Sequence, residues 1–347
     1  MGLLGVASPR LEPPLRYLYV GVPGSDLDTR NSGVSLLVFD IGHEHRFVKR
    51  ISIWPAEATF EKVRGMELAP AAPSRLYIST TQRLGALDSA SGRVLWSHAY
   101  GGHCCDQFAV SPNGRLIYAP AFGSPNWYVI DAVTGTLTST TPVIGWPRST
   151  AFSRDGRLVY LSAWESNRLS VADTTSNQVT REVGPFSGFL CTFTLNRNGT
   201  LAFANIDGLV GFEVGDLKTG LILDRVRIDG YGADDLNAYE CPSHGIAFTV
   251  DDKELWVADG VGNRLRIFDA TTYPPREKSS VQLKGQPRAV RFGRDGRFAY
   301  VSTGDVLDAT TKAVVATLKD DRGTTVESER MIEVDVPSST PAVGDRR

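Results

Sequence analysis

Two histidines, His103 and His244, are the residues of this chain best suited to acid–base chemistry. The imidazole group titrates near neutral pH, so it can accept or release a proton under physiological conditions. Asp106 follows His103 closely, and Glu240 precedes His244. A histidine beside a carboxylate could act as a catalytic base or acid, or His103, His244 and Glu240 could bind a divalent metal ion. A hydrogen-bonded structural histidine is the alternative for each.

Two arginines, Arg148 and Arg288, occur in the same local motif, because each directly follows a proline in a Gly-x-Pro-Arg sequence. A guanidinium that faces a protein channel needs water, a carboxylate or an anionic ligand as its partner. One alternative is that these arginines pair with Asp106, Glu67 or other carboxylates in a wet channel. The other is that they bind a carboxylate or phosphate of a ligand, for which paired guanidiniums are well suited.

The elements that position these residues belong to a repeat. A short apolar strand, an Asp-Gly or Asn-Gly turn and a second strand with Tyr, Phe or Trp recur along the chain, for example up to Tyr118, Tyr160, Phe203 and Tyr300. Two further copies, ending near Tyr77 and at Trp256, lack the turn glycine. An interval of about 40–45 residues is typical of β-propeller blades. Alternating apolar residues with Gly-rich turns indicate antiparallel strands.

The repeat predicts an all-β fold, a seven-bladed β-propeller of four-stranded antiparallel blades. Six units begin near Gly65, Asp106, Arg148, Cys191, Gly245 and Arg288. The N-terminal unit lacks one strand, and residues 330–336 near the C-terminus are the predicted donor. Such closure leaves no long open edge in the ring. We expect residues 1–336 to form a single propeller domain and residues 337–347 to form a disordered tail.

The predicted site lies where the innermost strands begin, because the loops before these strands share one face with the loops between second and third strands. Blade alignment places His244 at the position of Pro147 and Pro287, with Cys105 at the same position in the third blade. The loop 230–244 lengthens one repeat interval by about ten residues, which is typical of a functional loop; a solvated acidic loop is the alternative. The candidate binding residues are Arg148, Arg288, Asp106, Glu240, Trp164 and Tyr239.

Segments of two repeats, residues 158–173 and 255–269, resemble the YVTN family of β-propeller repeats. In that family a Tyr-Val-Ala/Thr-Asn strand precedes a Val-x-Val-Ile-Asp strand, and four aspartates occupy the closing acidic position here: Asp88, Asp131, Asp173 and Asp269. The resemblance implies a lactonase-like or streptogramin-lyase-like propeller shape. The chain contains no matching signature of those enzymes' catalytic residues. The aspartates themselves are expected to form turns by accepting backbone N–H bonds.

Composition excludes several classes of function. Apolar residues make up 41% and charged residues 22% of the 347 residues, as in ordinary globular proteins. A net charge of −2 gives no field that would attract nucleic acid, so no nucleic-acid partner is expected. No apolar run reaches the roughly 18–20 residues of a membrane span. The first residues show no secretory signal, and both a cytoplasmic location and export with a removed signal stay open.

The four cysteines, Cys104, Cys105, Cys191 and Cys241, show no C-x-x-C spacing, which argues against a zinc knuckle or a redox motif. Reduced, partly buried thiols are expected. A disulfide between adjacent Cys104 and Cys105 is the alternative.

These observations favour a propeller that binds a small polar, anionic metabolite at its channel mouth. In an enzymatic version, His244 or His103 would act as base or acid in lyase, isomerase or hydrolase chemistry, while Arg148 and Arg288 would stabilise negative charge. The alternative is a non-catalytic module that binds a protein or polymer through an exposed aromatic or apolar patch, for which there are four candidate residues: Trp54, Trp146, Trp164 or Phe186. No cofactor is predicted beyond the candidate divalent metal.

Overall fold

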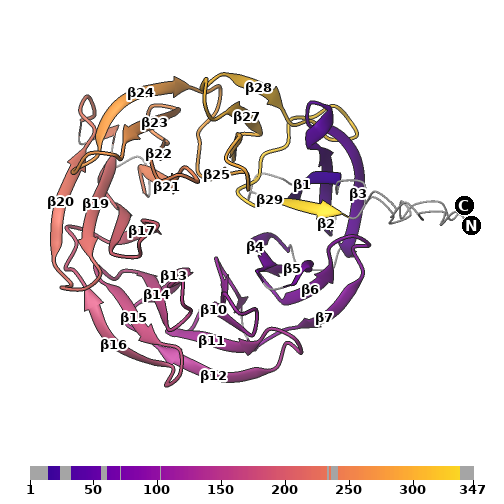
Figure 1. The fold of residues 1–347 in the computed structure, drawn as a ribbon. Helices are drawn as coiled ribbons and strands as arrows, with labels where there is room; N and C mark the ends of the chain where they lie inside the picture. Colours follow the sequence, from indigo (N-terminus) through magenta and orange to yellow (C-terminus); the bar gives the residue numbers. More distant parts are fainter. Residues whose placement is uncertain are drawn as a thin grey trace, which may run out of the picture.

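The computed structural model describes residues 15–23, 33–55, 61–70, 72–101, 103–232, 234–235 and 241–336, without the side chains of Pro73, His103 and Phe122. Seven antiparallel sheets are arranged around a common centre (Figure 1). Six contain four strands, and the third contains a fifth short strand. The predicted seven-bladed β-propeller is therefore confirmed. The predicted tail, residues 337–347, lies outside the described residues.

Each blade runs from an innermost strand to an outermost one. The first blade contains β29 (Met331–Val336), β1 (Leu15–Val22), β2 (Val34–Asp40) and β3 (Arg46–Trp54), with a 3-10 turn η1 (Ile41–His43) between β2 and β3. The second contains β4 (Val63–Ala69), β5 (Ala72–Thr80), β6 (Leu84–Asp88) and β7 (Val94–His98). The third contains β8 (His103–Cys104), β9 (Ala109–Val110), β10 (Leu116–Phe122), β11 (Asn126–Asp131) and β12 (Leu137–Pro142).

The remaining four blades follow in chain order. The fourth contains β13 (Trp146–Phe152), β14 (Leu158–Trp164), β15 (Leu169–Asp173) and β16 (Gln178–Val183). The fifth contains β17 (Leu190–Leu195), β18 (Leu201–Ile206), β19 (Gly211–Asp216) and β20 (Ile222–Arg227). The sixth contains β21 (Ser243–Phe248), β22 (Glu254–Asp259), β23 (Arg264–Asp269) and β24 (Arg276–Gln282). The seventh contains β25 (Val290–Phe292), β26 (Phe298–Val301), β27 (Asp305–Asp308) and β28 (Val314–Thr317).

The recurring tyrosine of the second strand connects neighbouring blades. Tyr19 Oη donates to the carbonyl of Ser89 at 2.8 Å, and Tyr77 Oη donates to the carbonyl of Ala132 at 2.9 Å. In both cases the acceptor directly follows the aspartate that ends the third strand of the next blade, Asp88 or Asp131. A buried phenol needs such a partner, while its ring packs between the sheets. The repeated aromatic position therefore sets how adjacent blades pack.

The recurring aspartates form turns, as predicted. Asp131 Oδ1 accepts from the backbone nitrogens of Val133 and Thr134 at 2.9 and 2.8 Å, and Asp173 makes the equivalent pair of bonds. The bond from the Thr134 backbone is the largest contribution that lowers the pKa of Asp131 below its usual value. These carboxylates are committed to the architecture and are not free for chemistry.

The ring closes where β29 pairs with β1, from Leu15 opposite Val336 to Val20 opposite Met331. Figure 1 shows β29 as the inner strand of the first blade. Buried Glu333 on β29 accepts a hydrogen bond from Tyr300 Oη at 2.7 Å. The C-terminal strand thus completes the N-terminal blade, as the repeat count predicted.

His45 lies in the turn between β2 and β3 of the first blade, yet it is not exposed to solvent. Its ring is buried, lies edge-to-face against Phe298 at 4.7 Å, and its Nε2 lies 3.3 Å from Tyr300 Oη. Burial is the main cause that lowers the pKa of His45 to about 4. The imidazole ring of His45 fills the junction between the first and seventh blades, so the turn that carries it folds against Phe298 and Tyr300.

The expectation of reduced thiols was wrong, since all four cysteines form disulfides. Cys104 is bonded to Cys105, and Cys191 to Cys241, whose Cα atoms are 5.8 Å apart. The second bond joins β17 of the fifth blade to the segment just before β21 of the sixth. Separation by 50 residues hid this pairing in the sequence, because only the ring geometry brings the two positions together.

In the part of the chain that the structure describes, no helix has the length and apolar character needed to cross a membrane.

Candidate ligand site at the channel mouth

A cavity of about 540 Å³ opens where the innermost strands begin, at one end of the channel. Its volume lies within the range of small-molecule sites. Its lining includes four residues predicted from the sequence: Arg148, Arg288, Asp106 and Trp164, together with His244. The fold therefore brings these residues together, although they come from the third, fourth, sixth and seventh blades.

Backbone bulges direct three of the lining residues towards the cavity. Arg64, Arg148 and His244 each occupy the extra position in a register shift of the innermost strand: the pairing skips from Val63 to Gly65, from Pro147 to Ser149 and from Ser243 to Gly245. A bulge leaves one residue out of the ladder and changes the direction of its side chain. The same irregularity therefore places one side chain from each of these three blades at the channel mouth.

This register corrects the blade alignment of His244. Ser243 pairs with Asp259 as Pro147 pairs with Ala163, so His244 corresponds to Arg148 rather than to Pro147. The sequence agrees with this correspondence, because His244 precedes Trp256 by the same interval as Arg148 precedes Tyr160. The corrected alignment places His244 at the position that Arg148 and Arg288 occupy in their blades. We call this position, where the innermost strand of each blade begins, the ring position.

Three further blades contribute charged or sulfur-containing side chains at the equivalent position. Asp106 is equivalent to Arg148. Each lies three residues before the residue that pairs with the recurring tyrosine of its blade: Ala109 with Tyr118, and Ala151 with Tyr160. Cys191 is skipped between Leu190 and Thr192, and its side chain forms the disulfide with Cys241. Glu329 directly precedes Arg330, whose carbonyl accepts from Gly21 of the second strand.

His244 lies between the guanidiniums of Arg148 and Arg288. Its Nδ1 is 3.0 Å from the carbonyl oxygen of Arg288, so this nitrogen carries the proton and donates. Its Nε2 then accepts from Arg148 Nη2 at 3.4 Å and from Arg288 Nη2 at 3.2 Å. Burial, followed by the two positive charges, outweighs the attraction of Glu329 and lowers the pKa of His244 to about 4. The ring is neutral at pH 7.

Arg148 is supported from one side by an indole ring. Its guanidinium carbon lies 4.9 Å from the centre of the Trp164 ring, a cation–π arrangement. Among the described residues, no carboxylate forms an ion pair with Arg148, and its only side-chain acceptor is His244. The remaining N–H groups of this guanidinium are therefore available to a ligand in the cavity.

Arg64, Arg288 and Arg330 belong to a chain of ion pairs. Arg288 Nε lies 3.2 Å from Glu329, and Arg330 Nη1 lies 3.3 Å from the same carboxylate. Asp106 accepts longer contacts from Arg330 at 3.9 Å and from Arg64 at 3.8 Å. Burial alone would raise the pKa of Glu329, but the positive charges around it, above all that of Arg330 and also those of Arg288 and Lys62, lower it to about 2. Glu329 is thus ionised throughout the physiological range.

Positive charge exceeds negative charge around the cavity. Five cationic side chains line it, Lys62, Arg64, Arg148, Arg288 and Arg330, against three carboxylates, Asp106, Glu165 and Glu329. The local excess of two positive charges contrasts with a net charge of −2 for the whole chain. A concave, partly dehydrated site strengthens this local field. The arrangement is suited to hold an anion.

Part of the predicted site cannot be placed. Tyr239 and Glu240 lie outside the described residues, as does the side chain of His103, whose backbone belongs to β8. Among the described residues, no group of three His, Cys, Asp or Glu side chains is arranged to bind a metal ion. The catalytic role of His103 and the metal site of His103, His244 and Glu240 therefore stay predictions.

Sequence reasoning missed Lys62, Glu329 and Arg330 as members of the site. Arg330 is the first residue of the segment 330–336 predicted to close the ring, and Glu329 directly precedes it; both lie just before the observed strand β29. Extending the blade alignment to these two positions would have found both. Lys62 gives no such signal in the sequence. It lies two residues before Arg64, which occupies the ring position of the second blade, and its side chain becomes buried only when the chain folds.

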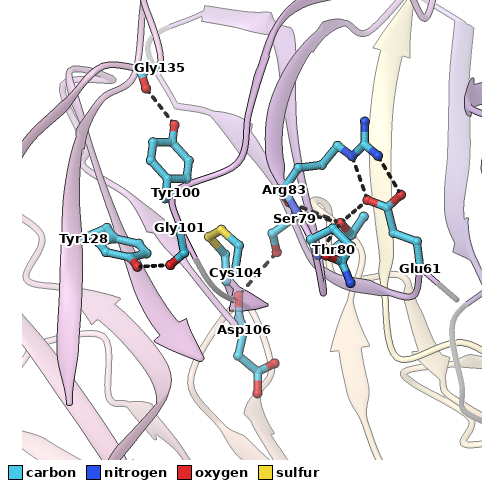
Figure 2. Close-up of a disulfide and its surroundings, with 12 residues drawn as sticks. Glu61, Ser79, Thr80, Arg83, Tyr100, Gly101, Cys104, Asp106, Tyr128 and Gly135 are labelled. Atoms are coloured by element: carbon cyan, nitrogen blue, oxygen red, sulfur yellow. Dashed lines mark hydrogen bonds and ion pairs between the residues drawn. A yellow bond between two sulfur atoms is a disulfide. The ribbon is translucent and has the colours of Figure 1, made fainter. Parts of the chain in front are cut away.

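The Cys104–Cys105 disulfide lies directly beside the ring residue Asp106 (Figure 2). Cys105 has a φ of 116°, in the region that favours glycine, and both cysteines are buried. Figure 2 shows the Asp106 carboxylate directed away from the sulfur atoms, while the Asp106 carbonyl accepts from Ser79 Oγ at 3.3 Å. The positive φ of Cys105 therefore fixes the direction of the backbone at Asp106, the ring residue of the third blade.

No protein-family model and no curated protein matches the chain. The YVTN resemblance therefore stays a prediction. Solved structures do resemble it, and one is a chain of Kuenenia stuttgartiensis hydrazine synthase, with a TM-score of 0.50 and 16% sequence identity. That match covers 75% of this chain and 96% of the other. At this identity the similarity concerns the fold alone.

Proposed function

We propose that this propeller binds a small anionic metabolite in the cavity at its channel mouth. The observation that carries the proposal is Arg148, a half-buried guanidinium that has no carboxylate partner among the described residues and is oriented by His244 and Trp164. A dehydrated guanidinium is stabilised by a carboxylate or phosphate that accepts two of its N–H groups. The excess of positive charge around the cavity supports the same ligand class.

The contacts of His244 favour a binding role over acid–base catalysis by this residue. Both ring nitrogens have hydrogen-bond partners. With a pKa of about 4 the imidazole is a weak base, and at pH 7 it carries no extra proton that it could donate as an acid. A neutral Nε2 that accepts from two guanidiniums holds them side by side. In this proposal His244 is a positioning residue for Arg148 and Arg288.

The alternative interaction module receives less support. Two of the four aromatic residues expected to form its exposed patch, Trp54 and Phe186, are buried. Arg148, Arg288 and His244 converge in one cavity instead of being dispersed over the face.

A thermal-shift screen tests the proposal. Phosphate, citrate, acetate and glucuronate are compared with uncharged glucose and glycerol at low ionic strength, on the wild type and on Arg148→Gln. We expect at least one anion to raise the melting temperature of the wild type, with a smaller shift in Arg148→Gln and at higher salt. If no anion stabilises the wild type, or if Arg148→Gln responds equally, the proposal is refuted.

A His244→Ala variant, together with metal analysis of the wild type, tests the enzymatic version separately. Binding alone predicts weaker anion affinity in His244→Ala, because the two guanidiniums lose their shared acceptor. A bound divalent metal that is lost in this variant would instead support the predicted metal site.

A further inference from the structure

An exposed aromatic rim extends outward from the cavity over the fourth and fifth blades. Trp146, which lines the cavity, is 45% exposed and pairs across the strands with Trp164. The Trp164 ring contacts Phe189 with 6.2 Å between ring centres, and Phe189 is 41% exposed. Large aromatic side chains at a protein surface commonly mark a binding site. The rim and the cationic cavity share Trp146 and Trp164, so one ligand can contact both.

Polar groups on the rim restrict what this ligand is. Glu165 follows Trp164, is exposed, and lines the cavity with no ion pair or hydrogen bond among the described residues. Gln107 also lines the cavity, and its Oε1 accepts from Ser149 while its amide N–H groups have no described partner. A free carboxylate beside two indole rings accepts hydroxyl hydrogens, whereas it disfavours a purely apolar group.

From this combination we infer that the ligand is a saccharide that carries an anionic group, a carboxylate or a phosphate. The inference rests on the proposed function. The anionic group binds to Arg148 and Arg288, and the C–H face of the sugar ring packs on the exposed face of Trp146. The hydroxyl groups donate to Glu165, which neither an aromatic acid nor a fatty acid can use.

The charge distribution favours this class over its competitors. A neutral sugar leaves the excess positive charge of the cavity unpaired. An aromatic acid matches the arginines and the rim but leaves Glu165 against its apolar ring, at an energetic cost. A hydroxylated ring with one anionic group satisfies the guanidiniums, the indole ring and the free carboxylate together.

Isothermal titration calorimetry with matched ligand pairs tests the inference. Glucuronate and galacturonate are compared with acetate, and glucose 6-phosphate with inorganic phosphate, so that the two sources of negative charge are measured separately. Glucose and benzoate complete the set. We expect one sugar acid or sugar phosphate to bind about tenfold more tightly than its small-anion counterpart, which corresponds to about 1.4 kcal/mol.

Two variants on the rim, Trp146→Ala and Glu165→Gln, test which residues produce that advantage. Each is expected to reduce the ratio between sugar-anion and small-anion affinity about fivefold. Leu221→Ala is the matched control, since Leu221 is 62% exposed on the fifth blade and does not line the cavity. The control should keep the wild-type ratio.

Three outcomes overturn the inference. If acetate or phosphate binds as tightly as the sugar anions, the rim adds nothing, and only the proposed anion binding stands. If benzoate binds more tightly than glucuronate and the phosphate pair shows no sugar advantage, the ligand class is an aromatic acid. If no anion binds, the inference and the proposed function fail together.

Discussion

Replacing Glu329 by Gln should have opposite effects on stability and on anion affinity. Glu329 lies 3.2 Å from Arg288 and 3.3 Å from Arg330, which is almost completely buried. The substitution keeps the size and shape of the side chain but removes its charge. Arg330 then loses its closest carboxylate, while the Nε–H of Arg288 is released from its ion pair and can make a further contact with the ligand.

The structure gives the size of both effects. A pKa that falls from 4.5 to about 2 on folding corresponds to about 3 kcal/mol of stability at pH 7. Removing one partner of a buried ion pair costs about 3–5 kcal/mol. Arg330 keeps the contact with Asp106 at 3.9 Å and a bond to the Arg64 carbonyl, so we expect about 2–3 kcal/mol. Anion affinity should increase about tenfold, because the released Nε–H of Arg288 contributes about 1.5 kcal/mol through an additional charge-assisted hydrogen bond.

Urea denaturation at pH 7 measures the stability, and calorimetry with the best-binding anion measures the affinity. The sign of the linkage follows from the lowered pKa: the wild type loses the Glu329 contribution as the pH falls from about 4.5 towards 2, and Glu329→Gln does not. Glu327→Gln, exposed on the same segment, is the control. Unchanged stability in Glu329→Gln would refute the role of the ion-pair chain, and weaker anion binding would refute the electrostatic description of the cavity.

Three further predictions concern stability. The double variant Cys191→Ser/Cys241→Ser should lower the free energy of unfolding by about 2–4 kcal/mol in urea, because the bond closes a long loop; equal stability would contradict this. His45 has a pKa of about 4 in the folded state, so stability should fall between about pH 6.5 and 4, and the pH slope should be shallower in His45→Gln. An unaltered slope would argue against this role. Tyr231→Phe should lose about 1 kcal/mol in thermal or urea unfolding, because Tyr231 Oη donates to Asp259 at 2.6 Å; no loss would mean that this bond is replaced by water.

The fold could be predicted from the sequence because its determinants are local. Each blade carries its own turn residues and its own aromatic position, so the period of the repeat identifies the strands without long-range information. Closure by residues 330–336 followed from the missing strand of the first blade. The structure confirms it in the pairing of β29 with β1.

The site could be predicted only in part, because its geometry depends on features that leave no mark in the sequence. Arg148 and Arg288 were found from a shared motif, and the structure brings them within 3.4 and 3.2 Å of the same imidazole nitrogen. The one-residue error in the alignment of His244 had no such cause, because His244 precedes Trp256 by the same interval as Arg148 precedes Tyr160, and both strands carry the same bulge. The neutral state of His244 arises from burial and from two guanidiniums contributed by other blades.

The cysteines show the same limit. Cys191 and Cys241 are 50 residues apart, and nothing in their local sequence indicates a bond. They meet because Cys191 occupies the ring position of the fifth blade and Cys241 lies just before β21 of the sixth. Structural disulfides of this kind are typical of proteins that fold in oxidising surroundings.

The affinity of the double variant Arg148→Gln/Arg288→Gln for the best-binding anion tests the central claim most directly. Calorimetry at low ionic strength should show a loss of at least about 100-fold relative to the wild type, since two charge-assisted contacts of about 1.5 kcal/mol each are removed. Arg157→Gln, a substitution of an arginine whose side chain is 85% exposed, should bind as the wild type does. If the double variant binds the anion as tightly as the wild type, the cavity at the channel mouth is not the anion site.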